Sequence, residues 1–347
     1  MGIKIILLII FFAVMAAVGI YSRRHVTSVD GFVLGGRSVG PWLTAFAYGT
    51  SYFSAVVFVG YAGQFGWKYG IASTWIGIGN ALIGSLLAWV VLGRRTKVMT
   101  QHLGSRTMPD FFGERYKSKS LKITASVIVF VFLIPYTASV YNGLSRLFAM
   151  AFNIPYTWCV VTMAAFTALY VILGGYMATA INDFIQGIIM LIGIVAVIAA
   201  VLNGQGGFMN AIAEMAKIPS DVPLTQGQPG AFTSFFGPDP VNLLGVVLLT
   251  SLGTWGLPQM IGKFYAIKDE KSISTGTIIS TIFAIIISGG CYFLGGFGRL
   301  FDSPEIYDKA GGAVVYDSII PHMLSMLPDL LIGVVVCLLY TSDAADE

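Results

Sequence analysis

Long apolar runs constrain this chain most, because each has the length of a membrane-crossing helix. A helix needs about 20 mostly apolar residues to cross the hydrocarbon core of a bilayer. Hydropathy predicts nine such spans, near residues 3–20, 41–64, 70–93, 121–150, 156–173, 178–203, 241–266, 274–298 and 318–336. Only 11% of the residues are charged, against roughly 25% in soluble domains. The sequence therefore predicts an all-α polytopic membrane protein.

Basic residues gather in alternate loops, and this bias predicts the orientation. Fourteen of the twenty Lys and Arg side chains lie in or at the edges of three loops, at 21–40, 94–120 and 263–273. Loops rich in Lys and Arg stay in the cytoplasm. These loops are predicted to be cytoplasmic, which places the N-terminus outside the cell membrane and makes 204–240 an extracellular loop. That loop is rich in Gly, Pro and Gln, and it either covers the outer vestibule or is mobile.

Two of the predicted spans carry polar, glycine-containing interruptions that a plain lipid-facing helix has no need of. In the second span the interruption is Tyr48-Gly49-Thr50-Ser51-Tyr52, followed by Ser54, and in the seventh it runs from Thr250 to Gln259. Broken backbone at membrane depth is tolerated where it faces protein or a water-filled cavity. Two such spans in separate parts of one chain indicate a transporter built from repeats, with the substrate between them.

The interruption in the second span offers oxygen ligands. The hydroxyls of Thr50, Ser51 and Ser54 and the backbone carbonyls around them suit a hard cation such as Na⁺. The alternative is that small polar residues only let helices pack closely.

Ser51, Tyr52 and Ser54 in the second span are candidate substrate contacts, and others come from the fourth and seventh spans. Thr254, Trp255 and Gln259 supply polar and stacking groups beside the second interruption, although Trp255 could equally pack against lipid or protein. In the fourth span Pro135 predicts a kink, and Tyr136 is a candidate to line the pocket. Arg146, near the outer end of that span, either snorkels to the interface or attracts an anionic substrate.

Asp183 is the one acidic residue well inside a predicted span. An ionised Asp at a helix centre costs about 2.5 to 3.5 kcal/mol on insertion scales, so such a residue indicates function as cation ligand, gate or proton carrier. Asn182 and Gln186 make the same part of the helix polar, which fits an ion exit route. The alternative is that Asp183 caps the helix or is solvated near its cytoplasmic end.

Motifs of other functional classes are absent from the sequence. It has no phosphate-binding loop with its lysine, which argues against ATP-driven transport, and no enzyme motif. Its three cysteines are isolated in apolar runs and its three histidines are scattered, so neither a disulfide framework nor a metal cluster is predicted. The net charge of +3 gives no indication of a nucleic-acid partner.

Three motifs resemble the sodium:solute symporter family. They are Leu34-Gly35-Gly36-Arg37-Ser38-Val39-Gly40-Pro41 before the first interrupted span, Pro109-Asp110-Phe111-Phe112 in the basic loop, and the stretch from Gly174-Gly175 to Asp183-Phe184-Ile185-Gln186-Gly187. The last is the most specific, and the resemblance runs from the first span to about residue 336.

The resemblance implies the leucine-transporter-type fold of five-plus-five inverted repeats with an extra N-terminal helix. The N-terminal helix and its cytoplasmic loop would then occupy 1–40, the first repeat 41–203, the extracellular loop 204–240, and the start of an incomplete second repeat 241–336. It further implies a Na⁺ site formed by the backbone carbonyls of Thr50 and Phe53, completed by hydroxyls of the span that begins at about 318. Asp183 matches the family's acidic residue on the sodium path.

The chain departs from proline-type members of the family at two places. Those members carry an Asp where this chain has Tyr52, and Gln-Pro-His where it has Leu257-Pro258-Gln259. The stretch from Ser51 through Phe53 to Ala55, with the sequence around Pro258, is more similar to the pantothenate branch.

The last eleven residues, 337–347, resemble the translation of a sequencing-library adapter and interrupt an apolar run. We therefore expect the natural sequence to continue differently after Val336, and the 347-residue chain alone not to transport.

Together these features predict a Na⁺-coupled symporter that imports a small, carboxylate-bearing solute and has the lipid bilayer as its surroundings. Two alternatives stay open at this point. A C-terminal signalling module would make the protein a membrane solute sensor, and coupling through Asp183 would make it proton-driven. A pure channel is disfavoured, because paired broken helices suit alternating access.

Overall fold

The structure is a computed structural model that describes residues 2–23, 28–53, 56–308 and 312–339. Its helices in chain order are α1 (Gly2–Ser22), α2 (Val29–Leu34), α3 (Pro41–Tyr52), α4 (Ala62–Tyr69), α5 (Thr74–Gly79), α6 (Arg94–Leu103), α7 (Met108–Tyr116), α8 (Lys119–Phe152), α9 (Tyr156–Gly204), α10 (Phe208–Lys217), α11 (Pro240–Gly253), α12 (Pro258–Ala266), α13 (Glu270–Gly295), α14 (Tyr316–Ser325) and α15 (Asp329–Leu339). Within the described residues, β pairing is confined to two isolated bridges. The predicted all-α class is confirmed.

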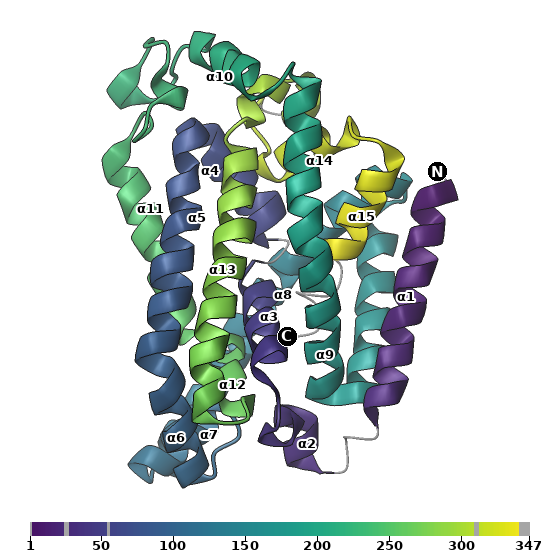
Figure 1. Ribbon diagram of the computed structural model, residues 1–347, viewed down its shortest axis with the longest axis vertical. Coiled ribbons are helices and arrows are strands. Elements are labelled where there is room, and N and C mark those ends of the chain that lie inside the picture. Colours follow the sequence, from purple (N-terminus) through teal and green to yellow (C-terminus); the bar gives the residue numbers. More distant parts are fainter. Residues whose placement is uncertain (1, 24–27, 54–55, 309–311, 340–347) are drawn as a thin grey trace.

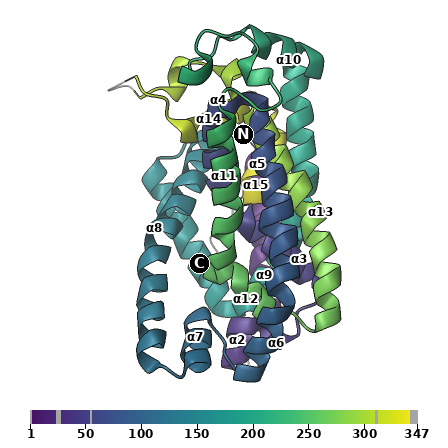
Figure 2. The same ribbon diagram turned by 90° about the vertical axis from the view of Figure 1, so that its left-hand side faces the viewer.

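The long helices lie side by side along the longest axis of the molecule (Figures 1 and 2). In the described part, five helical stretches are long and apolar enough to cross a membrane, and the bent pair α11–α12 makes a sixth. The short helices α2, α6 and α7 gather at one end, and α10 lies at the other. The basic loops at 21–40 and 94–120 thus share one end, as their charges predict, opposite the loop at 204–240.

Glycines end or divide helices where the sequence predicts separate spans. Gly70 (φ 61°, ψ −142°) ends α4 before the rod that runs from α5 through wide π-helical turns into α6. Gly175 (φ 56°, ψ −157°) divides the 49-residue α9 into two arms. L-residues with a side chain rarely adopt either conformation. Gly70 therefore marks the boundary between the spans predicted at 41–64 and 70–93, and Gly175 separates those predicted at 156–173 and 178–203.

The loop at 204–240 is folded over its end of the bundle, and Arg299 holds it there. The guanidinium of Arg299 lies 4.8 Å from the ring centroid of Trp67 and 3.9 Å from that of Phe232. It also donates to the carbonyl of Trp67 (2.7 Å) and to a carboxylate oxygen of Asp221 (2.6 Å). One cation therefore joins the loop to α4.

Both predicted interruptions occur, but the first begins later than the sequence suggests. The residues from Tyr48 to Tyr52 are helical and α3 ends at Tyr52, while helical turns resume at Val56. The Oγ1 of Thr50 donates to the carbonyl of Phe46 (2.9 Å), and the Oγ of Ser51 to that of Ala47 (2.6 Å). Because these hydroxyls are satisfied within the helix, they do not end it.

The second interruption bends the chain by 53° between α11 and α12. Leu257 has extended backbone (φ −72°, ψ 128°) and Pro258 is the first residue of α12, where its missing N–H costs nothing.

The span predicted over 318–336 is instead two short helices, α14 and α15. They are separated by 326–328, and Pro328 directly precedes Asp329, the first residue of α15. Proline disfavours helical backbone in the residue before it, which explains the separation. The α15 end of the pair packs on α1, where Lys4 and Asp329 form an ion pair of 2.8 Å.

Candidate functional site

A central cavity of about 310 Å³ lies between the two interruptions. Its walls come from the end of α3, the turns after it, the α5–α6 rod, α8, the α11–α12 bend and α13. Four predicted substrate residues line it, namely Ser51, Tyr52, Tyr136 and Thr254. The structure therefore brings together side chains from three predicted spans at the place where both broken helices meet.

A hydrogen bond across this cavity joins the two broken spans directly. The hydroxyl of Tyr52 donates to the carbonyl of Thr250 at 3.0 Å. Thr254 donates to the carbonyl of Ser251 at 3.0 Å, within its own turn. Tyr52 therefore links α3 to α11 and also lines the cavity.

The sequence analysis missed Asn80, which joins the rod to α11. Its Oδ1 accepts from the Oγ1 of Thr250 (2.9 Å) and from the Oγ of Ser251 (3.0 Å). Asn80 and Tyr292 both line the cavity and are both buried. Asn80 is the one amide side chain in the span predicted at 70–93. A single amide inside a membrane span indicates a functional residue, so the sequence could have identified Asn80.

The wall of the central cavity holds hydroxyl, amide, aromatic and aliphatic groups, and none of its described lining residues is charged. A ligand there is recognised by hydrogen bonds and ring faces. A charge on such a ligand would have to be met by helix ends or by a bound ion. Leu257 lines the cavity and is the N-cap of α12, so the positive end of that half-helix faces the same space.

The residues expected to hold Na⁺ lie at the end of α3. Thr50 is buried and helical, and Phe53 is the first residue past the helix (φ −103°, ψ 60°), with its N–H bonded to the carbonyl of Gly49 at 3.0 Å. The last carbonyls of a helix have no partner within the helix, so this end offers oxygens to a cation. Ser54, predicted as a substrate contact, lies outside the described residues.

Two further predicted substrate residues lie outside the lining of the central cavity. The indole N–H of Trp255 donates to the carbonyl of Ile83 at 3.1 Å, which joins the α11–α12 bend to the rod. Gln259 lines a separate cavity of about 480 Å³, which also contacts Arg106 and Pro109 at the basic end of the molecule.

Asp183 lies beside this second cavity and forms an ion pair that the sequence analysis did not predict. The Nζ of Lys263 on α12 is 3.9 Å from Oδ2 of Asp183 on α9, and both side chains are at most 2% exposed. The same Nζ lies 5.3 Å from the ring centroid of Tyr176. Lys263 had been counted with the cytoplasmic loop charges, whereas the structure buries it inside the bundle.

Buried amide groups surround this ion pair. The side-chain amides of Asn182, Gln186 and Gln259 have no hydrogen-bond partner among the described residues. Buried polar groups without a protein partner are commonly met by water or ions. The region around Asp183 is therefore polar, as the sequence predicted, and suited to a hydrated cation.

A third cavity, of about 630 Å³, lies at the opposite end of α8 and includes Arg146. The Nε of Arg146 donates to Oδ1 of Asn142 at 3.2 Å and lies 4.0 Å from a carboxylate oxygen of Asp317 on α14. Asn142 in turn donates to Asp317 at 3.1 Å. Arg146 therefore helps to hold α14 against α8.

Comparison with known proteins adds three findings. The profile of the Sodium:solute symporter family matches residues 32–341. Sodium/proline symporters of Staphylococcus aureus, for example from strains JH9 and NCTC 8325 / PS 47, are 33% identical over 276 residues, which is 77% of this chain and 51% of the relative. The chain thus spans about half the length of these curated relatives. A solved Na⁺-coupled sialic acid symporter, in a substrate-bound outward-open state, matches with a TM-score of 0.75 at 15% identity, over 99% of this chain and 71% of that one.

Proposed function

Because the chain belongs to the sodium:solute symporter family, we propose that it imports a small solute across the cell membrane together with Na⁺. Its relatives are transporters and not enzymes. The observation that supports this most is the central cavity, because both helix interruptions and the hydrogen bond between Tyr52 and Thr250 lie on its wall. A site at the meeting of two broken helices is accessible from either side when the half-helices tilt.

Sodium would bind at the end of α3, through the backbone carbonyls of Thr50 and Phe53. A cation at this helix end is favoured by the negative end of the helix dipole. Since Tyr52 lies between these two residues and reaches α11, an ion that orders this turn also orders the wall of the substrate cavity. Each ligand would then favour the same state, which is the thermodynamic condition for coupling.

The solute would be small and bear a carboxylate. A cavity of about 310 Å³ is at the lower end of small-molecule sites. Its wall offers no charged side chain among the described lining residues, so a carboxylate would be met by the N-terminal end of α12 and by the bound Na⁺. Tyr52, Tyr136 and Thr254 would provide hydrogen bonds and ring contacts to the remainder of the solute.

Asp183 and Lys263 would form the inner gate, with the N-terminus outside the cell and the basic loops in the cytoplasm. Their ion pair joins α12 to α9 between the central cavity and the basic end of the molecule. When α12 tilts, Lys263 leaves Asp183, whose carboxylate then becomes available to a departing Na⁺. The unpartnered amides of Asn182 and Gln186 would assist this exit.

Uptake by the full-length gene product in proteoliposomes tests this proposal. Radiolabelled L-proline and pantothenate are offered under an inward Na⁺ gradient, a choline gradient, or a pH gradient without Na⁺. Accumulation is expected with Na⁺ alone. Accumulation under the pH gradient without Na⁺ would show that uptake is coupled to protons instead of Na⁺. Binding without accumulation would favour a solute sensor.

A matched pair of variants ties uptake to the central cavity. Tyr52→Phe removes the hydrogen bond to Thr250, and a net loss of about 0.5–1.5 kcal/mol weakens solute binding by roughly 2- to 12-fold. Tyr21→Phe makes the same chemical change on α1, where the side chain is 59% exposed, and should leave uptake unchanged. Equal effects of the two variants would place the substrate elsewhere.

A further inference from the structure

A second buried lysine, Lys97 on α6, lies against the carboxyl end of α12. It is 1% exposed, and its Nζ donates to the backbone carbonyl of Tyr265 at 3.5 Å. Among the described residues, no carboxylate forms an ion pair with this ammonium. The burial comes from α6 and the described helices packed against it, so further chain outside the bundle would leave it in place.

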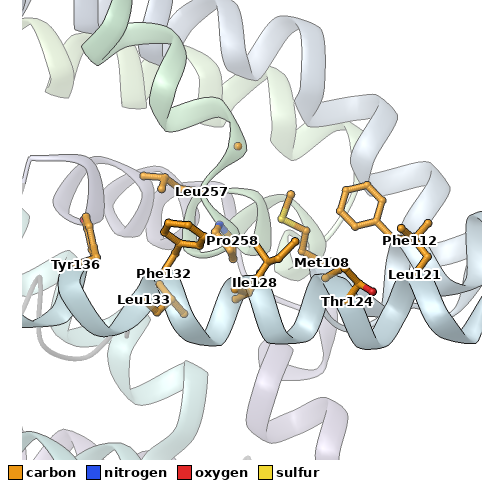
Figure 3. A pocket seen from close by; sticks show the side chains of 13 residues that line it. Met108, Phe112, Leu121, Thr124, Ile128, Phe132, Leu133, Tyr136, Leu257 and Pro258 are labelled. Carbon is orange, nitrogen blue, oxygen red and sulfur yellow. The ribbon is translucent and has the colours of Figure 1, made fainter.

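The partner of Lys97 is the end of a half-helix that the proposed function requires to move. The last carbonyls of a helix have no partner within it. The carbonyl of Tyr265 is met by Lys97, and that of Ala266 by the N–H of Val39 at 3.3 Å. At the opposite end of α12, Pro258 faces apolar side chains of α8 (Figure 3). Polar contacts with neighbouring elements therefore lie toward the carboxyl end of α12, and the one with Lys97 carries a charge.

The surroundings of Lys97 disfavour its charged form. Burial, followed by repulsion from Arg37, lowers the pKa of Lys97 from its ordinary value of 10.5 to about 8, and Asp269 at the start of α13 opposes this only in part. An ammonium removed from water without a carboxylate partner is expected to respond in this way.

Other titratable groups on and around α6 leave Lys97 in this state. Within the described residues, those on α6 itself and on the cytoplasmic parts of the helices packed against it are Arg94, Arg95 and His102 on α6, Lys263 and Tyr265 on α12, Asp110, Glu114, Arg115 and Tyr116 on α7, and Glu270 and Lys271 on α13. Two of the three carboxylates in this set are paired elsewhere, Asp110 with Lys122 and Glu270 with Arg94.

We infer that Lys97 couples the position of α12 to the pH at the basic end of the molecule, because its neutral form favours the closed arrangement and its ammonium favours opening. The inference rests on the proposed function, in which α12 tilts at its bend. When the end of α12 moves away, water reaches Nζ and the lysine takes up a proton. The proton enters and leaves on the same side of the membrane, so it would regulate the transport cycle without driving it.

The size of the effect follows from the two protonation equilibria. Lys97 would titrate at about 8 when α12 is closed and near the ordinary 10.5 when it is hydrated. Linkage then lowers the equilibrium constant for opening about tenfold between pH 7 and pH 9, and most of this change lies above pH 8. Lys97→Met has no group to titrate at this place, so its opening should lack the change.

Hydrogen–deuterium exchange of the full-length gene product measures this equilibrium without requiring transport. The backbone N–H of Lys268 donates to the carbonyl of Val39 at 2.9 Å, so its exchange requires the end of α12 to leave its place. Wild type and Lys97→Met are compared at equal pH, which cancels the intrinsic chemistry of exchange. The ratio of the wild-type rate to the variant rate should fall about tenfold from pH 7 to pH 9.

Two further variants separate titration from loss of the contact. Lys97→Gln keeps an N–H donor for the Tyr265 carbonyl but has no titrating group. Its opening should be as independent of pH as that of Lys97→Met, and it takes the place of that variant should Lys97→Met fail to fold. Lys119→Met makes the same chemical change at an exposed lysine and should keep the wild-type pH dependence.

The outcomes distinguish this inference from the proposed function. A rate ratio that stays constant from pH 7 to pH 9 would overturn the inference, and so would an equal loss of pH dependence in Lys119→Met. Na⁺-driven uptake observed together with either result would leave the proposed symport standing. A tenfold change in a protein without Na⁺-driven uptake would instead support the role of Lys97 and overturn the symport.

Discussion

Neutralising Lys263 alone should destabilise the protein far more than neutralising Lys263 and Asp183 together. The two charges are 3.9 Å apart and almost fully buried. At an effective dielectric constant of about 20, unit charges at this distance attract by about 4 kcal/mol. Lys263→Met leaves the Asp183 carboxylate buried without its cation, and loss of one partner of a buried pair typically costs about 3–5 kcal/mol.

The double variant Lys263→Met with Asp183→Asn contains no buried charge at this place, so most of that cost should be recovered. Denaturant titrations of the purified chain in one detergent measure the free energies of unfolding of the wild type, both single variants and the double variant. A coupling energy of about 2–3 kcal/mol is expected from this cycle. The exposed Lys268→Met should stay within about 0.5 kcal/mol of the wild type. Losses that simply add would show that the two side chains do not stabilise one another.

Three further substitutions test other contacts. Gly66→Ala places a Cβ 2.0 Å from a backbone carbonyl oxygen of α13 and should lower the free energy of unfolding by about 1–3 kcal/mol or more. The control Gly245→Ala places its Cβ where nothing lies within 4 Å. Equal unfolding free energies of the two variants would refute the close approach of α4 and α13. Asn80→Leu leaves a buried hydroxyl of α11 without its acceptor and should cost about 1–3 kcal/mol, and Asn80→Asp, which keeps the acceptor oxygens, should retain more solute binding than Asn80→Leu. The pKa of Asp110 is lowered chiefly by its hydrogen bond to Lys122, so Asp110→Asn should lower the free energy of unfolding at pH 7 by less than about 1 kcal/mol. A depressed carboxyl pKa contributes its full stabilisation above the unfolded value of 3.8, and this contribution is lost as pH falls through the folded value. The difference should therefore shrink progressively as pH falls below 3.8, and a pH-independent difference would contradict it.

Features with a local cause were predictable from the sequence. Apolar run length located most of the spans, and charge counting placed the basic loops at one end of the molecule. The Gly174-Gly175 pair marked the division of α9, because one of its residues adopts a backbone conformation that glycine alone tolerates easily. The second interruption was equally predictable from the sequence, since Pro258 restricts the backbone on both sides of the bend.

The contacts that build the site depend on partners distant in sequence, and local patterns do not reveal them. Lys263 lies three residues from the end of α12, a position typical of a loop-facing cation, and its burial follows only from the presence of Asp183 eighty residues earlier. Asn80 similarly acquires its role from α11, some 170 residues later. The start of the first interruption was misplaced because Thr50 and Ser51 bond back to their own helix, a choice that polarity alone does not predict.

The two half-helices nearest the basic end are also joined through their backbones. Val39, just before α3, accepts from the N–H of Lys268 (2.9 Å) and donates to the carbonyl of Ala266 (3.3 Å) at the end of α12. A tilt of α12 at its bend therefore pulls on the entry to α3, while the ion pair with Asp183 holds α12 to α9. The bend and the end of α3 are walls of one cavity, so in the proposed cycle release of that ion pair would allow α3 and α12 to move together. Opening toward the basic end would then begin with the loss of one electrostatic contact.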